Sequence, residues 1–240
     1  MRSLIISLLF FALTVPSVAL GHGIWFTQRT GDLTLVFGHG AQDLAYEADK
    51  VKSVVSVSQN GERRDVELIR NLKNVNLSAV KDAVALVTFF DNGSWIKNGD
   101  GKWQNVGKLQ VAGGSESHRA VKYNTHLAGK SRGPIKPTGA ALEIVPLRDP
   151  MSLKLGAALP VQVLLFGKPY KNARLRADYL GRPGEKTTTS TDAQGKVTLR
   201  IATDALNVIS VEFDEKTPNH PDVDEISHLA TLSFVLPHKE

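Results

Sequence analysis

The sequence predicts an all-β protein built from two β-sandwich domains. Its apolar segments are short and rich in Val, Leu, Thr and Phe, and Gly, Asn, Asp and Pro separate them. Little of the chain has the longer periodicity that a helix requires. With 240 residues, of which 42% are hydrophobic, the chain is long enough for two domains with buried cores.

The first residues have the pattern of an export signal. Met1, Arg2 and Ser3 give a positively charged start, residues 4–15 are apolar, and Pro16 ends the run. The apolar run is too short for a comfortable transmembrane helix. Small residues allow cleavage after Ala19 or after Gly21. We therefore expect residues 1–21 to be a signal peptide and the mature protein to be soluble and periplasmic.

In the first predicted domain, residues 22–130, His22 starts the first strand, and residues 33–37 form the next strand, which His39 ends. Asn60 and Gly61 separate two further strands, which is the commonest signal of a short hairpin. A nearly continuous apolar run at 84–90 predicts a central strand, and residues 91–114 predict a Gly-rich loop that carries Trp95 and Trp103. The strands expected around these features span 52–58, 64–70 and 117–127.

The second predicted domain, residues 140–238, follows a connection at 130–139 that contains two prolines and three basic residues. Short strands at this spacing indicate an antiparallel sandwich. The expected strands are 141–146, 159–166, 173–179, 196–202, 208–213 and 229–235.

Composition excludes several classes of protein. The chain has no cysteine, which excludes disulfide scaffolds, thiolate metal sites, iron–sulfur clusters and cysteine nucleophiles. The net charge of +5 comes from scattered residues, so we expect no nucleic-acid partner. The motifs of α/β-hydrolases, P-loop proteins and zinc proteases are absent. Any transition-metal site must therefore rely on His, Asp, Glu, Met or backbone nitrogen.

His22 and His39 form the strongest candidate metal site. Either predicted cleavage puts His22 at or near a free amine, which is itself a metal ligand. His39 lies between two glycines at the end of a strand, where the backbone can turn sharply. A short antiparallel pairing would bring the two imidazoles together. The alternative is that His39 is an incidental histidine in a turn.

His118 is the expected third ligand, because it lies where a loop meets a strand. His126 lies eight residues further on, about 26 Å away on an uninterrupted strand at ~3.3 Å per residue, so the two cannot share one ion. Each of them alone is more often an ordinary surface histidine. The loop at 219–228 also holds imidazoles and carboxylates, but its pattern matches no ordered calcium loop and favours a solvated loop.

Several segments together resemble a family of exported bacterial proteins of poorly defined function, whose members are often labelled periplasmic components of nickel or cobalt uptake systems. The resemblance rests on HGIWF from His22, FGHG at 37–40, GAALEIVPL at 139–147, and the segments 167–169, 191–195 and 230–234. It implies an N-terminal β-rich domain, then an immunoglobulin-like or carboxypeptidase-regulatory-like sandwich. It also implies divalent metal handling, with His22 and His39 matching the two histidines of the family.

The leading hypothesis is therefore a periplasmic protein that binds Ni, Co or Cu as a divalent ion and delivers it to an uptake system. Its partners would be the metal ion and a membrane metal transporter or outer-membrane receptor. One alternative is a copper mono-oxygenase-like enzyme, which also uses an N-terminal histidine. The other is an adhesive or structural sandwich protein without chemistry.

Overall fold

The computed structural model describes residues 21–78, 80–181 and 188–237, and it confirms the all-β prediction. Within these residues the regular elements are strands, which form three sheets, and three short 3-10 helices, η1 (Ala48–Lys50), η2 (Lys108–Gln110) and η3 (Pro150–Ser152). No helix in the described ranges is long and apolar enough to cross a membrane. The predicted signal peptide lies almost wholly outside them.

A large central sheet forms the middle of the molecule. Its strands follow the order β14-β13-β16-β17-β9-β7-β3-β4, with β8 paired to β7. These strands are β3 (Val51–Ser58), β4 (Arg63–Asp65), β7 (Ala83–Lys97), β8 (Trp103–Gln104), β9 (Ser117–Leu127), β13 (Arg174–Arg176), β14 (Thr188–Ser190), β16 (Leu206–Lys216) and β17 (Glu225–Val235).

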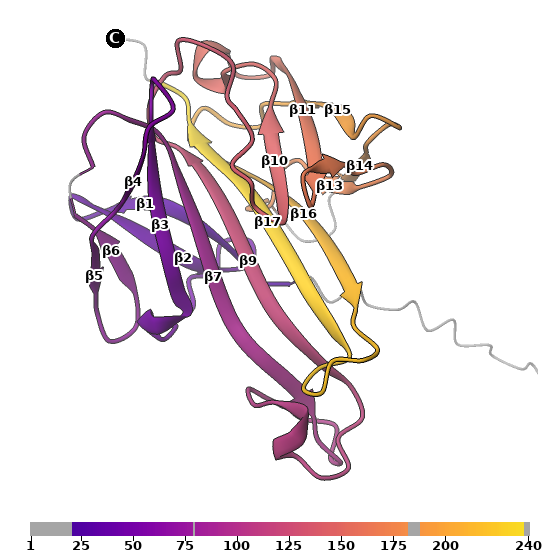
Figure 1. The fold of residues 1–240 in the computed structure, drawn as a ribbon. Helices are drawn as coiled ribbons and strands as arrows, with labels where there is room; N and C mark the ends of the chain where they lie inside the picture. Colours follow the sequence, from indigo (N-terminus) through magenta and orange to yellow (C-terminus); the bar gives the residue numbers. More distant parts are fainter. Residues whose placement is uncertain (1–20, 79, 182–187, 238–240) are drawn as a thin grey trace, which may run out of the picture.

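Two smaller sheets cover the two faces of the central sheet (Figure 1). The N-terminal sheet has the order β1-β2-β6-β5, with β1 (Gly23–Arg29), β2 (Asp32–Gly38), β5 (Leu68–Arg70) and β6 (Val75–Leu77). The C-terminal sheet contains β10 (Leu142–Pro146), β11 (Ala158–Leu165), β12 (Lys168–Pro169) and β15 (Lys196–Arg200).

Each interface between layers has its own apolar core. Phe26 and Leu35 of the N-terminal sheet pack against Leu86 and Phe90 of the central sheet. On the opposite face, the C-terminal sheet packs against apolar side chains of β9, β16 and β17, among them Leu232 of β17. The molecule is thus two sandwiches that share their middle layer.

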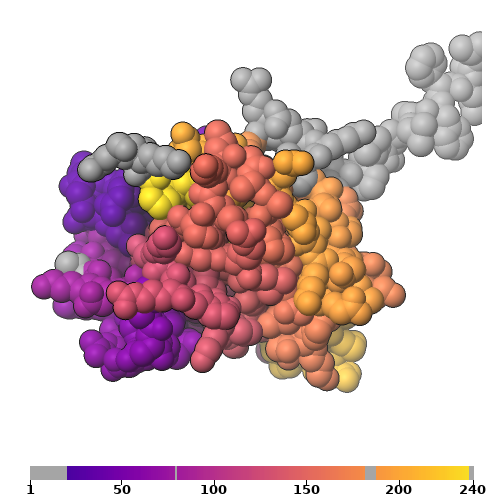
Figure 2. All heavy atoms as spheres, turned by 90° about the horizontal axis from the view of Figure 1, so that it is seen from above, coloured from indigo at the N-terminus to yellow at the C-terminus, as the bar shows by residue number. Residues whose placement is uncertain are grey.

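The two predicted domains, residues 22–130 and 140–238, share this central sheet. The connection 130–139 has no strand, as expected, but β9 before it pairs in parallel with β17 near the end of the chain. The pairing removes two sheet edges that would otherwise expose unpaired backbone groups. Seen from above, the N-terminal part (indigo to magenta) and the C-terminal part (orange) lie on opposite sides of the red segment between them (Figure 2).

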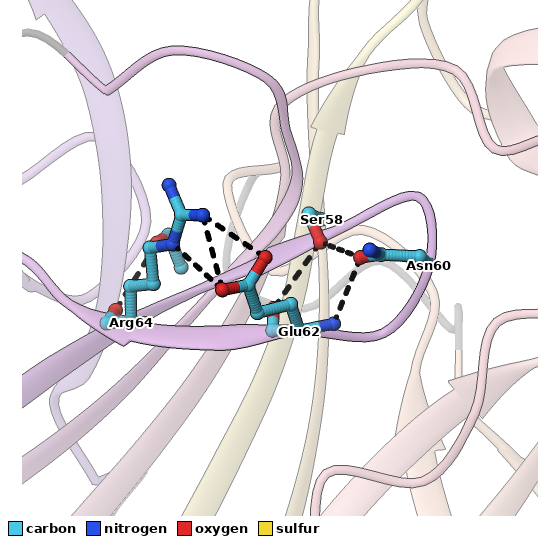
Figure 3. A network of polar contacts seen from close by, with 5 residues as sticks. Ser58, Asn60, Glu62 and Arg64 are labelled. Carbon is cyan, nitrogen blue, oxygen red and sulfur yellow. Dashed lines mark hydrogen bonds and ion pairs between the residues drawn. The ribbon is translucent and has the colours of Figure 1, made fainter.

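The predicted hairpin around Asn60-Gly61 is confirmed, with β3 pairing to β4. Gly61 has the positive φ that the turn requires. The turn is also held by side chains: the Asn60 amide oxygen accepts from the Glu62 N–H at 3.2 Å, and Arg64 pairs with Glu62 at 3.0 Å (Figure 3). The strand expected at 64–70 is divided, since β5 joins the N-terminal sheet instead.

The loop expected at 91–114 begins later than predicted. The strand β7 continues to Lys97 because residues Asp91 to Ser94 form a bulge that shifts the register without ending the strand. Gly93 adopts a positive φ there, and its N–H bonds to the Asp91 carboxylate at 3.0 Å. The bulge extends the central sheet beyond the end of the N-terminal sheet, and the candidate site lies in this region.

Candidate metal centre

The hairpin β1–β2 places His22 and His39 one residue beyond its last strand pair. The two strands pair antiparallel from Arg29 opposite Asp32 to Gly23 opposite Gly38. Continued by one residue, this register places His22 directly opposite His39. Across such a pair the Cβ atoms lie about 4.5–5.5 Å apart, which is close enough for both imidazoles to bind one metal ion.

The glycines beside His39 are needed for this geometry. A Cβ on Gly38 would lie 2.3 Å from the carbonyl oxygen of Gln42, so the close return of the chain excludes any side chain there. Gly40 has a φ of +59°, which favours glycine. His39 is therefore held at the turn where β2 ends.

Tyr179 ties the end of the hairpin together. Its hydroxyl accepts the Gly23 N–H at 2.7 Å and donates to the Gly21 carbonyl at 2.6 Å, with the Gly38 carbonyl 3.1 Å away. Its ring also contacts His39 edge-on, with centroids 5.4 Å apart. Burial raises the pKa of Tyr179, so the phenol stays neutral. Tyr179 thus fixes both strand ends, a role that no local sequence pattern indicates.

Burial and nearby positive charges favour the neutral form of both imidazoles. Burial lowers the pKa of His22, and the positive charge of Lys122 and the nearby His39 lower it further. Burial and the guanidinium of Arg176 lower the pKa of His39. A neutral imidazole has a lone pair for a metal ion, whereas a protonated one has none.

Arg176 competes for His39. Its Nη1 lies 3.1 Å from Nε2 of His39, so the guanidinium donates to that nitrogen and the ring proton lies on Nδ1. In this arrangement neither nitrogen of His39 is open to a metal ion. Binding through Nε2 therefore requires Arg176 to move away.

His118 lies on the same cavity as His22 without joining the pair. The cavity has a volume of about 810 Å³ and lies on the face of the central sheet beyond the end of the hairpin. Trp103 packs edge-on to His118 at 4.9 Å between ring centroids. Burial lowers the pKa of His118, although the charge of Glu225 opposes this effect. Lys122 and Glu212 also line this cavity, and no sequence motif marks either of them as a site residue.

Other described histidines have structural surroundings. His126 is only 7% exposed, so it is a core residue and not a surface one; its Nδ1 lies 3.0 Å from the Ser233 hydroxyl. His228 is buried between the Tyr123 hydroxyl and Glu215, at 3.2 Å from each. His220 accepts an N–H of its own loop.

The His, Asp and Glu side chains that the structure describes do not form a closed metal site. Across the described ranges, no group of three His, Asp or Glu side chains converges closely enough to hold an ion. Two facing imidazoles leave coordination positions open, which suits temporary binding better than a permanent structural ion. The three-histidine set of His22, His39 and His118 stays a prediction.

Comparison with known proteins identifies the family. The family described as a domain of unknown function, DUF4198, matches residues 19–215. No curated protein and no solved structure matches the chain. The match covers the first predicted domain and residues 140–215 of the second, and it includes the hairpin with its two histidines. The protein therefore belongs to DUF4198, an uncharacterised bacterial family.

Proposed function

We propose that this protein is a periplasmic carrier that binds nickel, cobalt or copper as a divalent ion and delivers it to an uptake system. The observation that supports this proposal most strongly is the register of β1 and β2, which sets His22 opposite His39. Imidazole nitrogen suits all three metals, and copper binds most tightly at equal availability.

The terminal amine would supply a third nitrogen. Cleavage after Gly21 would make His22 the first residue, so its amine and ring could bind one ion together with His39. Cleavage after Ala19 would leave His22 as the third residue, where the amine, two amides and the ring suit square-planar Cu(II) or Ni(II). In the first case, positions stay open for water or a ligand that arrives with the metal.

The positively charged groups around the two histidines would favour release of the metal ion. Arg176 lies on His39, and Lys122 lowers the pKa of His22 through its charge. Two cations beside the ligands weaken the binding of another cation. Such a site holds metal less tightly than a closed site does, as transfer to a transporter or outer-membrane receptor requires.

Calorimetry on the chelator-treated exported form tests this function. Ni(II) and Cu(II) should bind wild type, and His22→Ala and His39→Ala should each weaken binding more than about tenfold, since even outer-shell partners of metal ligands contribute 10–100-fold. His220→Ala is the matched control, because this loop histidine is exposed and its Nδ1 accepts an N–H of its own loop. One extra residue placed before His22 should also weaken binding if His22 is the first residue.

Equal affinity in wild type, His22→Ala and His39→Ala would contradict the proposal and place any metal site elsewhere. Oxidation of an added reductant by oxygen, catalysed by the copper-loaded protein, would instead favour the mono-oxygenase-like alternative.

A further inference from the structure

Lys122 is a buried lysine whose amine has no partner among the residues that the structure describes. It lies on β9 and is only 4% exposed. Among the described residues, its amine donates no hydrogen bond and forms no ion pair. The amine lies over the Phe37 ring, 6.0 Å from its centroid, and the His22 ring lies against the same Phe37 at 5.3 Å. A buried cation without a partner costs stability, and such groups are typically retained for binding.

Lys122 lines the cavity that borders His22. In the sheet, Leu229 separates Lys122 from Glu212, and all three line this cavity. Burial lowers the pKa of Lys122 to about 8, and the nearby Glu212 opposes this effect without forming an ion pair. At neutral pH the amine therefore remains largely a cation that can accept an anionic group.

The other charges of the cavity limit which anion can enter. Five carboxylates and two lysines line it. Three of the carboxylates are already paired with lysines, which leaves Glu212 and Asp214; the pairs are Glu116 with Lys97, Asp224 with Lys108 and Glu225 with Lys216. A ligand with several negative charges would meet repulsion from Glu212 and Asp214.

We propose that the cavity receives the metal as a complex with a small amino-carboxylate chelator, whose single carboxylate binds the Lys122 amine. This inference rests on the function proposed above and names the form in which the cargo arrives. A bare ion would need no cavity of about 810 Å³ beside its ligands. A divalent ion with one carboxylate remains net positive and suits the acidic lining. The chelator would fill the coordination positions that two imidazoles leave open.

Two nickel complexes test this proposal without any variant. Histamine is histidine without its carboxylate, so the 1:1 complexes of Ni(II) with histidine and with histamine differ in that group, with its one negative charge and its oxygen ligand for nickel. Calorimetry on the exported form should show at least about tenfold tighter binding of the histidine complex, the usual effect of a hydrogen bond to a charged group. Ni(II)–citrate should bind no better than the histamine complex.

The Lys122→Met variant identifies the residue responsible. It should bind both complexes equally, at the wild-type level for histamine, and should bind bare Ni(II) at least as well as wild type. Its midpoint of thermal unfolding should equal or exceed that of wild type, because a buried charge is removed while the volume is kept. Lys216→Met is the matched control, since Lys216 lines the same cavity but is exposed and paired with Glu225. It should keep the preference for histidine.

Equal binding of the two complexes by wild type overturns the inference, as does a preference that survives in Lys122→Met. If the protein binds bare nickel but does not distinguish the complexes, only this inference fails. If it binds nickel in no form, the proposed function fails as well.

Discussion

The two faces of β9, β16 and β17 are both buried but differ in chemistry. The face under the C-terminal sheet is apolar, with side chains such as Val211, Leu232 and Phe234. The face under the N-terminal hairpin carries buried polar and charged groups on the same three strands: Lys122, Asn124, His126, Ser210, Thr231 and Ser233. Alternation along a strand thus separates a stabilising face from a polar face, although neither of them faces water.

Hydrogen bonds link the polar face to the hairpin and also join side chains within that face. The Thr231 hydroxyl donates to the Ile24 carbonyl of β1, and the Asn124 amide donates to Ser233 at 3.0 Å. Two buried oxygens in the described structure, Thr88 Oγ1 and Asn124 Oδ1, still have no partner. Such incomplete satisfaction costs stability. The apolar face therefore stabilises the fold, whereas the polar face binds the hairpin through hydrogen bonds.

Substituting neighbouring residues of β17 gives the largest expected contrast. Phe234→Ala should lower the free energy of unfolding by about 3–5 kcal/mol, because it empties a fully buried site on the apolar face. Ser233→Ala, one residue away on the polar face, should cost only about 1–3 kcal/mol through its lost hydrogen bonds. Chemical denaturation measures both values. Equal losses would show that the two faces contribute alike.

Acid should destabilise the polar face through His126. Burial lowers its pKa to about 4 from 6.5, so the unfolded chain takes up a proton between these values while the folded chain does not. Stability should therefore fall as the pH drops from about 6.5 to about 4, by at most about 3 kcal/mol from this residue. Unfolding of wild type and His126→Leu across this range measures the difference. His220→Ala should follow the wild-type curve, and a His126→Leu curve parallel to wild type would refute the assignment.

Removing Arg176 should strengthen metal binding. Arg176→Met frees Nε2 of His39 and removes a positive charge, so we expect an affinity for Ni(II) that is about three- to tenfold higher. Arg174→Met is the matched control, because Arg174 lies two residues away on β13 and makes no hydrogen bond to a described histidine. Unchanged or weaker binding by Arg176→Met would mean that Arg176 does not compete for the site.

Local patterns predicted many of the strands and the antiparallel pairing that ends beside His22 and His39. FGHG, with its two glycines, marked a strand end, and the short hairpin supplied the register. The sharing of the central sheet could not be predicted this way, because the parallel pairing of β9 with β17 joins segments about 100 residues apart and leaves no local signal. The bulge at Asp91 was missed for a related reason, since Gly and Asn in a strand look like a loop.

The surroundings of the site were harder to predict than the histidines. Tyr179, Arg176 and Glu212 approach the hairpin from the C-terminal half, so only tertiary structure shows their contacts. Lys122 carried a faint signal, because it is a charged residue amid a strand that is otherwise largely buried. A lysine in such a strand is ordinarily expected to face water.

Nuclear magnetic resonance of the imidazole nitrogens during a Ni(II) titration tests the central claim most directly. Paramagnetic nickel broadens the signals of the groups that bind it. Substoichiometric nickel added to the exported form should broaden His22 and His39 first, then His118 across the cavity, and should leave His126 and His228 sharp. Broadening that begins at His220 or His118, with His22 and His39 unaffected, would contradict the claim that the end of the β1–β2 hairpin is the metal site.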